Sequence, residues 1–541
     1  MLPRLKQGLA TLLVSSLILQ SCGGGAKTTD EIVFKYRIHS DPPSLDPAHG
    51  TDTTSGNILL RMFDGLVQFE PKTMEVIPAV AESWEIEDSR VFTFKIRKGV
   101  KFHNGREVKA EDFKYSFERT LDPETVSERQ WVLSPILGAT EFTDGKAGEV
   151  KGIEVIDDYT LRLTLEKSFA PFLSMLCMES ASVVPKEAVD EFGSDQFARN
   201  PIGCGPFKFV EWQSDISVTV EAFDDYYGDK SETIDKVKFM VIPSIPTALE
   251  AYKNGEIDFL DELPPGQIQN IRDNSPDDVK EWSQIGTYYI GFNHEKPPFK
   301  DNVKLRKAIN YAIDRQKIAN IIEEGLAIPA SGILSPGIPG HNPNFSPYKY
   351  DLEKAKQLMA EAGYPEGKGL PTIKIWYNTH DRHQRIVQYV QQELKKIGVN
   401  LEIKNLDWAA YLKALDSGEP EMYRMGWLVD YVDPDNFLYT LLHTSQIGAP
   451  GNYARYTSAK FDSLVELGRH LTDLDERIKV YQEAERIAVE DDAVWLFLYY
   501  YREIALINPK WENVILSPQG DFVTPIRYFR LKGADKPLAK K

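Results

Sequence analysis

Residues 19–22, Leu-Gln-Ser-Cys, are the first group with an evident chemistry, because they place a thiol directly after a small residue. A bacterial lipidation site needs that small residue and an apolar one two places before it, so that the signal peptide is cut and a diacylglycerol is joined to the thiol. Arg4 and Lys6 precede an apolar run over 9–19, as in a secretion signal. The pattern predicts export and a lipid anchor on Cys22.

A membrane-spanning helix is the alternative for this leader, but the apolar run is well short of the roughly 20 residues that cross a bilayer. No charged stop-transfer pattern follows it. We therefore expect residues 1–21 to be a lipoprotein signal peptide and residues 22–30 to be the lipidated cysteine and a linker. Such a protein is extracytoplasmic and lipid-anchored, in the periplasm or on the outer face of the cell membrane.

The composition is that of a large, acidic, folded protein. Of 541 residues, 42% are hydrophobic and 27% are charged, with a formal net charge of −18, which is ample for large cores and implies more than one lobe. An acidic surface repels phosphate backbones, so we expect no nucleic-acid partner. The nine histidines are scattered singly, without metal-ligand spacing, so we expect no metal and no cofactor.

Three motifs of nucleotide binding and catalysis are missing from the sequence. It contains no Gly-x-x-x-x-Gly-Lys-Ser/Thr loop for ATP, no Gly-x-Ser-x-Gly nucleophile and no His-Glu-x-x-His. These absences argue against an enzyme, and energy from ATP has to come from a partner. A surface adhesin or docking lipoprotein is the alternative from another class.

Cys177 and Cys204 are left as a pair once Cys22 is lipidated. In an oxidising compartment an even pair of cysteines can form a disulfide. Two buried free thiols are the equal alternative, and the sequence leaves both open.

The first half of the chain alternates apolar and polar residues, as half-buried strands do. Clear examples are 33–38, 92–97 and 160–165, and the pair Asn104-Gly105 predicts a hairpin turn. We expect a mixed, strand-rich first body.

Helices take over in the second half, with apolar residues three and four places apart. Strand, helix and strand follow one another there, which is typical of a parallel α/β sheet. A long apolar strand over 494–501 then returns the chain to the first body. The expected helices are 303–324, 351–362 closed by Gly363, 384–397 closed by Gly398, 458–472 and 475–489, and the expected strands are 372–376 and 399–403.

A series of ordered sequence blocks runs through nearly the whole mature chain. They lie at 81–84, 92–94, 97–105, 110–113, 184–187, 200–207, 297–299, 306–309 and 426–431. In this order the blocks resemble the family 5 solute-binding proteins, the dipeptide-, oligopeptide- and nickel-binding receptors of ABC importers, and their motifs are most similar to those of oligopeptide-binding lipoproteins. One departure is Cys204, in a Gly-x-Gly-Pro turn where the family often has threonine or another small residue.

The resemblance implies an α/β, two-lobe periplasmic-binding-protein fold, a type II-like hinged clamp that closes on its ligand. Two strands would join the lobes, crossing near 286–289 and 499–501. The expected domains are lobe I over 31–285 plus 501–541, with an extra subdomain over about 66–168, and lobe II over 286–500.

Asp430 matches the position at which peptide receptors of this family bind the free α-ammonium of the peptide. A desolvated carboxylate is costly unless a cation meets it, so such a residue provides affinity and selection together. By residue type alone, capping a turn or pairing with a protein cation are the alternatives.

Arg424, His383 and Arg382 match positions that meet the peptide carboxylate in oligopeptide and dipeptide receptors. Arginine suits this role because its planar fork can give a carboxylate two hydrogen bonds. The alternatives are a structural ion pair for Arg424 and a simple helix start for His383. Together with Asp430, these residues would hold a peptide by both ends.

Five aromatic residues match positions that line side-chain pockets in the oligopeptide receptors. Large, rigid rings with polar tips accept different side chains, while main-chain groups would pair with the peptide backbone. Core packing is the alternative, above all within the tyrosine run. The five are Trp427, Trp408, Tyr499, Tyr500 and Tyr501.

The resemblance thus implies a monomeric, lipid-anchored receptor that binds short peptides between its lobes and delivers them to an ABC permease and its ATPase. Relatives with the same fold bind nickel chelates, opines or oligosaccharides, which are the alternatives within the family. The presence of Asp430, Arg424 and His383 together favours peptides.

Overall fold

One large sheet runs through both halves of the molecule. The computed structural model describes residues 31–448 and 451–534, and its eleven-stranded sheet has the order β15-β14-β16-β12-β17-β11-β1-β10-β9-β8, with β13 beside β17. The strands are β1 Val33–Ile38, β8 Phe207–Gln213, β9 Ser217–Ala222, β10 Lys236–Val241, β11 Phe259–Leu260, β12 Val279–Phe292, β13 Ala327–Pro329, β14 Ile373–Asn378, β15 Leu401–Leu406, β16 Met422–Leu428 and β17 Trp495–Ile507.

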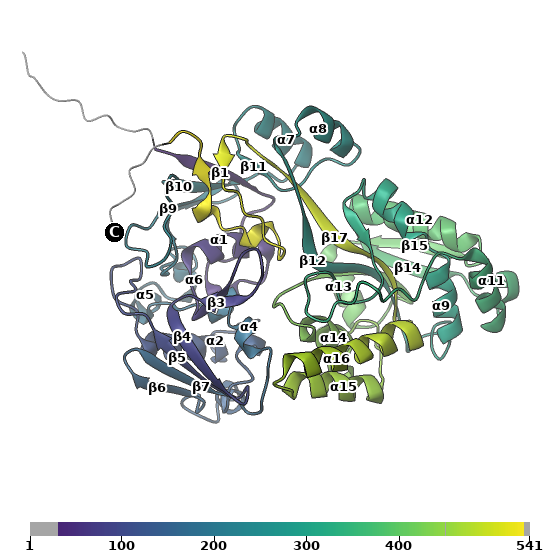
Figure 1. Ribbon diagram of the computed structural model, residues 1–541, viewed down its shortest axis with the longest axis horizontal. Coiled ribbons are helices and arrows are strands. Elements are labelled where there is room, and N and C mark those ends of the chain that lie inside the picture. The colour runs from purple at the N-terminus through teal and green to yellow at the C-terminus, as the bar shows by residue number, and fades with distance from the viewer. Residues whose placement is uncertain (1–30, 449–450, 535–541) are drawn as a thin grey trace, which may run out of the picture.

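The two long strands β12 and β17 join the lobes (Figure 1). They pair antiparallel from Val279 opposite Leu506 to Gly291 opposite Trp495. β16 pairs with residues 286–292 of β12, whereas β11 pairs with the far end of β17. β17 therefore has a strand of the first lobe, β11, at one end and a strand of the second lobe, β13, nearer the other. The predicted crossing segments lie within these two strands, and the two-lobe α/β fold is confirmed.

The core of the first lobe is built around β1. Phe34 on this strand meets the rings of Trp511 and Phe529 edge to face, at centroid distances of 5.0 and 5.4 Å. Both partners come from the segment after β17. The end of the described chain thus packs back onto its beginning.

A second, antiparallel sheet forms an extra subdomain on the first lobe. The strands predicted by alternation are confirmed, because Phe92, Phe94, Leu161 and Leu163 are all buried in its core. The turn at Gly105 is also confirmed, with φ of +90°. The limits 66–168 stay a prediction, as do the exact lobe boundaries. In sheet order the strands are β4 Ala81–Glu87, β5 Val91–Ile96, β7 Thr160–Thr164 and β6 Ile153–Asp157, and α2 Ala110–Leu121 lies beside them.

The second lobe has the strand, helix, strand arrangement that the sequence predicts. β14 and β15 pair in parallel and α12 (Asp381–Lys395) connects them. Gly363 and Gly398 follow their helices with φ of +94° and +82°, which only glycine adopts without strain.

The other longer helices of both lobes are α1 Thr53–Met62, α5 Lys186–Phe192, α7 Ile245–Lys253, α8 Ile268–Asn274, α9 Val303–Tyr311, α11 Leu352–Glu361, α13 Trp408–Asp416, α14 Asp435–Leu442, α15 Ala459–His470 and α16 Leu474–Arg486.

The helix expected over 303–324 is wrong as a single element. α9 ends at Tyr311, and Asp314 caps a separate short helix that follows. Arg315 holds this break against the sheet, because its Nε donates a 2.6 Å hydrogen bond to the carbonyl of Phe497. The apolar periodicity continues across the break, so the pattern alone does not reveal it.

The helix expected to start at Gln384 begins three residues earlier. His380 caps α12, because its Nδ1 accepts a 3.2 Å hydrogen bond from the N–H of Arg382. This cap places Arg382 and His383 in the first turn of the helix, at the end of β14.

The lobes also touch at contacts outside the crossing strands. The hydroxyl of Ser168 donates to the carbonyl of His470, and the N–H of Ala170 donates to the carbonyl of Arg469, both at 3.1 Å. Tyr431, which follows β16 in the second lobe, is 3% exposed and packs in the core of the subdomain. These contacts close the lobes against each other.

The two remaining cysteines are free thiols. The sequence left a disulfide and two free thiols open, and the structure has the free thiols. Cys177 packs against the subdomain core and Cys204 lies inside it, with its Sγ 3.9 Å from the carbonyl of Asp64.

The predicted leader and Cys22 lie outside the described residues. In the described ranges, every helix is too short or too polar to cross a membrane.

Removing the side chain of Tyr431 should loosen the closed arrangement. Tyr431→Ala leaves a space in the subdomain core and removes the 2.8 Å hydrogen bond from the tyrosine hydroxyl to Asp435. Loss of a buried aromatic ring costs about 3–5 kcal/mol, so we expect a larger radius of gyration in X-ray scattering. Tyr431→Phe keeps the ring and should stay compact. Equal compactness of the alanine variant would contradict the contact's role in closure.

Candidate binding site

Asp430 follows β16 and lies at the junction of the lobes. Asn436 Nδ2 donates to its carboxylate at 3.2 Å, and Gln519 Nε2 donates to its carbonyl at 3.0 Å. Among the residues that the structure describes, no side-chain cation lies within 4.0 Å of this carboxylate. Burial raises the pKa of Asp430, opposed by the charge of Arg129 and the hydrogen bond from Asn436. Asp430 is thus a half-buried carboxylate without a close counter-ion.

Arg129 of the first lobe is shared among several acids. Its Nη2 lies 4.0 Å from Glu179 Oε1, and its Nε donates to the carbonyl of Gly50 at 3.1 Å. Burial raises the pKa of Glu179; the charge of Arg129 opposes this shift, while Asp430 and Asp52 add to it. The charges of Asp430 and Asp52 thus both act on Glu179, and Arg129 acts on both Glu179 and Asp430.

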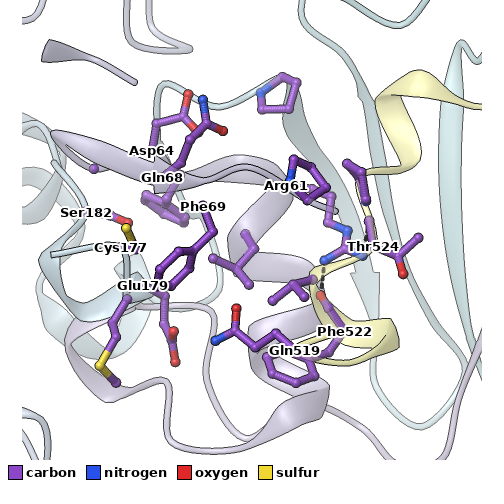
Figure 2. A pocket seen from close by; sticks show the side chains of 18 of the residues that line it. Arg61, Asp64, Gln68, Phe69, Cys177, Glu179, Ser182, Gln519, Phe522 and Thr524 are labelled. Atoms are coloured by element: carbon purple, nitrogen blue, oxygen red, sulfur yellow. Dashed lines mark hydrogen bonds between the residues drawn. The ribbon is translucent and has the colours of Figure 1, made fainter. Parts of the chain in front are cut away.

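A pocket opens beside Asp430, with walls from the first lobe and from the segment after β17 (Figure 2). Phe69 and Cys177 give it an apolar side. The guanidinium of Arg61 is held by the protein itself, because it donates to the carbonyls of Phe522 and Thr524. Asp64, Glu179 and Asp430 line this pocket together with Arg61 and Arg527.

Arg424 on β16 is 9% exposed and supplies the opposite charge. Its guanidinium stacks on Tyr288, 4.4 Å from the ring centroid, and its Nη1 donates to Asn378 Oδ1 at 3.2 Å. Its buried Nε has no hydrogen-bond partner. In the part of the chain that is described, no carboxylate oxygen lies within 4.0 Å of this guanidinium. Arg424 is thus a buried cation with unused donors.

His383 and Arg382 lie beside this guanidinium. His383 is 8% exposed, and its Nδ1 is 3.2 Å from the hydroxyl of Tyr288. Burial and the charge of Arg424 hold the pKa of His383 well below its usual range, so this imidazole is neutral. Arg382 is already paired, with its Nε 3.4 Å from Glu323 Oε2. Of the two arginines, only Arg424 is free of an ion pair.

The three consecutive tyrosines of β17 do not share one face. Tyr499 stacks on Tyr288 with ring centroids 4.6 Å apart, and Tyr501 lies edge-on to it at 6.3 Å. Tyr500 points to the opposite face, where its hydroxyl accepts a 2.9 Å hydrogen bond from the N–H of Gly332. Strand alternation therefore corrects the expectation that all three line the site: Tyr500 packs in the core of the second lobe.

The two tryptophans are also separated from the Arg424 group. Trp427 belongs to the Asp430 end, because its Nε1 donates to Asn436 Oδ1 at 3.0 Å. Trp408 begins α13 and is 48% exposed. The structure thus sorts the expected residues into a negative end and a positive end, with Trp408 on the surface.

Sequence reasoning missed three residues that shape these ends. Tyr288 was expected only as part of a crossing strand, yet its ring supports Arg424. Asn436 lies on α14 and Arg129 on the other lobe, and no local spacing rule connects either of them to Asp430. Only the alternation of side chains along β12 could have pointed to Tyr288.

Gly426 should be required for the position of Tyr501. A Cβ at residue 426 would collide with the Tyr501 hydroxyl and lie 3.4 Å from Arg424 Nη2. We expect Gly426→Ala to lower stability by about 1–3 kcal/mol, the usual cost of overpacking, in denaturant unfolding. The double variant with Tyr501→Phe lacks the colliding hydroxyl and should recover most of the loss. Full stability of the single variant would contradict this arrangement.

Two lobes joined by two long strands, with a carboxylate and a guanidinium on one segment near their junction, are typical of a clamp-type solute-binding protein. Residues 75–449 match the family described as bacterial extracellular solute-binding proteins, family 5 Middle. The chain belongs to this family, and the resemblance noted from its sequence blocks is confirmed.

Similar proteins cover nearly the whole chain. Heme-binding protein A of Haemophilus influenzae is 32% identical, over 94% of this chain and 96% of its own. The periplasmic oligopeptide-binding protein OppA of Escherichia coli is 33% identical, over 93% of both chains. Among solved structures, DppA of Helicobacter pylori in complex with the peptide STSA is 32% identical, covers 92% of this chain and 98% of its own, and has a TM-score of 0.77.

Proposed function

We propose that this protein is a lipid-anchored, extracytoplasmic receptor, not an enzyme, that binds short peptides between its lobes and delivers them to an ABC permease and its ATPase. The observation that carries the proposal is the presence of Asp430 and Arg424 on one segment of chain, each without a close protein counter-ion. A peptide has an ammonium at one end and a carboxylate at the other. It would neutralise both residues at once, which an uncharged ligand cannot do.

The spacing of the two charges suits a short, extended ligand. Asp430 lies six positions after Arg424, which corresponds to no more than about 20 Å at roughly 3.3 Å per residue. An extended peptide has a similar rise per residue. A peptide of a few residues would therefore reach from one charge to the other.

We assign Asp430 to the peptide's α-ammonium and Arg424 to its carboxylate. Neutral His383, next to Arg424, would meet the carboxylate of peptides of another length through a hydrogen bond. Arg382 would have to leave Glu323 to do the same, so it ranks behind Arg424. Trp427, Tyr499 and Tyr501 would contact ligand side chains.

The names of the relatives do not decide the ligand by themselves. OppA and DppA are named or solved with peptides, whereas the Haemophilus influenzae protein is named for heme. Heme carries carboxylates but no ammonium group, so it would leave Asp430 without a partner. The charge at Asp430 therefore favours peptides, and a ligand's free amine is the feature to test.

Asp430→Asn should abolish tight binding of peptides with free amino termini, because the amide keeps the shape and removes the charge. Loss of one partner from a buried charge pair costs about 3–5 kcal/mol, which is at least about 100-fold in affinity. Calorimetric titration of the chain that starts after Cys22, stripped of ligand by unfolding and refolding, would measure it with free and N-acetylated tripeptides. Unchanged affinity in the variant would contradict the assignment.

The same variant should melt at a higher temperature than the unchanged protein when both are ligand-free near pH 7. Burial raises the pKa of Asp430, so its ionised form destabilises the fold as the pH rises above the unfolded value of about 3.9. The gain should shrink as the pH falls toward about 4, where the carboxyl is protonated in the folded state. A lower melting temperature of the variant at neutral pH would count against this effect of burial.

Arg424→Ala and His383→Ala should change the preferred peptide length, because each would anchor the carboxylate of ligands of different length. Titration with a series of two- to five-residue peptides of one composition tests this. Equal losses at every length in both variants would argue against carboxylate anchoring and for a structural role.

A further inference from the structure

A second pocket lies next to the positive end of the site, between the lobes. Its walls are residues 261–268 of the first lobe, residues 322–326, the start of α12 and Glu503 on β17. Apart from Arg382, none of these residues has a role in the function proposed above.

Two of the acids in this pocket are already engaged by the protein. Asp261 forms an ion pair with Arg37 at 2.7 Å. Glu324 Oε1 accepts a 2.6 Å hydrogen bond from the N–H of Gly266. We therefore leave both out of the site described next.

Glu323 is the acid that is not fully engaged. It is 4% exposed, and its Oε2 lies 3.4 Å from Arg382 Nε. Its other oxygen, Oε1, is buried and has no hydrogen-bond partner. A buried acceptor left unpaired costs about 1–3 kcal/mol, so a donor that reached Oε1 would be stabilised there.

The charges around Glu323 leave room for one more cation. Glu503 and Glu262 face the same pocket as Glu323, and the charges of Arg382, Arg385 and Arg424 oppose the rise in the pKa of Glu323. Burial raises the pKa of Glu503 to about 7, opposed by the charge of Arg382. Once a ligand carboxylate neutralises Arg424, a positive charge on the same ligand would be stabilised beside these acids.

The pocket adjoins the end of the site that would hold the ligand's carboxylate. The charges of Arg424, Arg382, Glu503 and Glu323 all act on the pKa of Tyr501. Glu323 in turn interacts with the charge of Arg424. Arg382, which contacts Glu323, is followed in the chain by His383, which contacts the Tyr288 hydroxyl, and the Tyr288 ring carries Arg424. A residue whose carboxylate lay at Arg424 would therefore have its side chain close to this pocket.

We propose that Glu323, with Glu503 and Glu262, binds the cationic side chain of the ligand's last residue, so that the receptor selects peptides that end in lysine or arginine. This inference rests on the peptide-binding function proposed above. The ammonium or guanidinium donates to Glu323 Oε1, while Arg382 keeps Oε2. Specificity then comes from the charge of one side chain and not from the peptide ends.

Titration with three tripeptides that share their first two residues tests the proposal. The last residue is lysine, norleucine or glutamate, so that length and apolar area stay similar for the first two. We expect the lysine peptide to bind at least about tenfold more tightly than the norleucine peptide, and the glutamate peptide to bind most weakly. A lysine moved to the first position should give no such gain.

Glu323→Gln should remove the preference for lysine while the norleucine peptide binds as before. Glu324→Gln is the matched control: it removes a neighbouring charge whose oxygen is already occupied, and the preference should persist. Equal binding of the lysine and norleucine peptides by the unchanged protein would overturn the inference and leave the peptide-binding function standing. Failure of all three peptides to bind would overturn both.

Discussion

The antiparallel pairing of β12 with β17 is the interaction on which the rest of the structure depends. It carries one sheet through both lobes, and it gives β16 an edge to pair with over residues 286–292. The same register sets Tyr288 opposite Tyr499, and their stacked rings form the support on which the guanidinium of Arg424 lies. Lobe connection and binding-site geometry thus come from a single ladder of hydrogen bonds.

Much of the architecture could be predicted from the sequence, because its signals are local. Alternation of apolar residues located the strands of the subdomain, and glycines such as Gly363 and Gly398 located helix ends, since those positions need a positive φ. The break after Tyr311 was not predictable in this way. It depends on Arg315 reaching a carbonyl of β17, and a contact between residues so far apart leaves no trace in the apolar periodicity.

The candidate site was predictable only in part, for the same reason. Motif positions identified Asp430 and Arg424, but their lack of counter-ions is a property of the packed structure. Glu323 lay inside what the periodicity predicted to be a continuous helix, and Arg129 comes from the other lobe. Tyr500 shows the limit of residue type as evidence: three adjacent tyrosines are equivalent in composition, and only the pleat of β17 separates one of them from the other two.

The burial of the two free cysteines affects how fast they react outside the cytoplasm. Burial raises the pKa of both Cys177 and Cys204 well above the ordinary value for a thiol. The thiolate is the form that attacks disulfides and oxidants, so both sulfurs react slowly even in an oxidising compartment. The folded protein can therefore keep both thiols without an oxidant or an isomerase, whereas unfolding would expose them to oxidation.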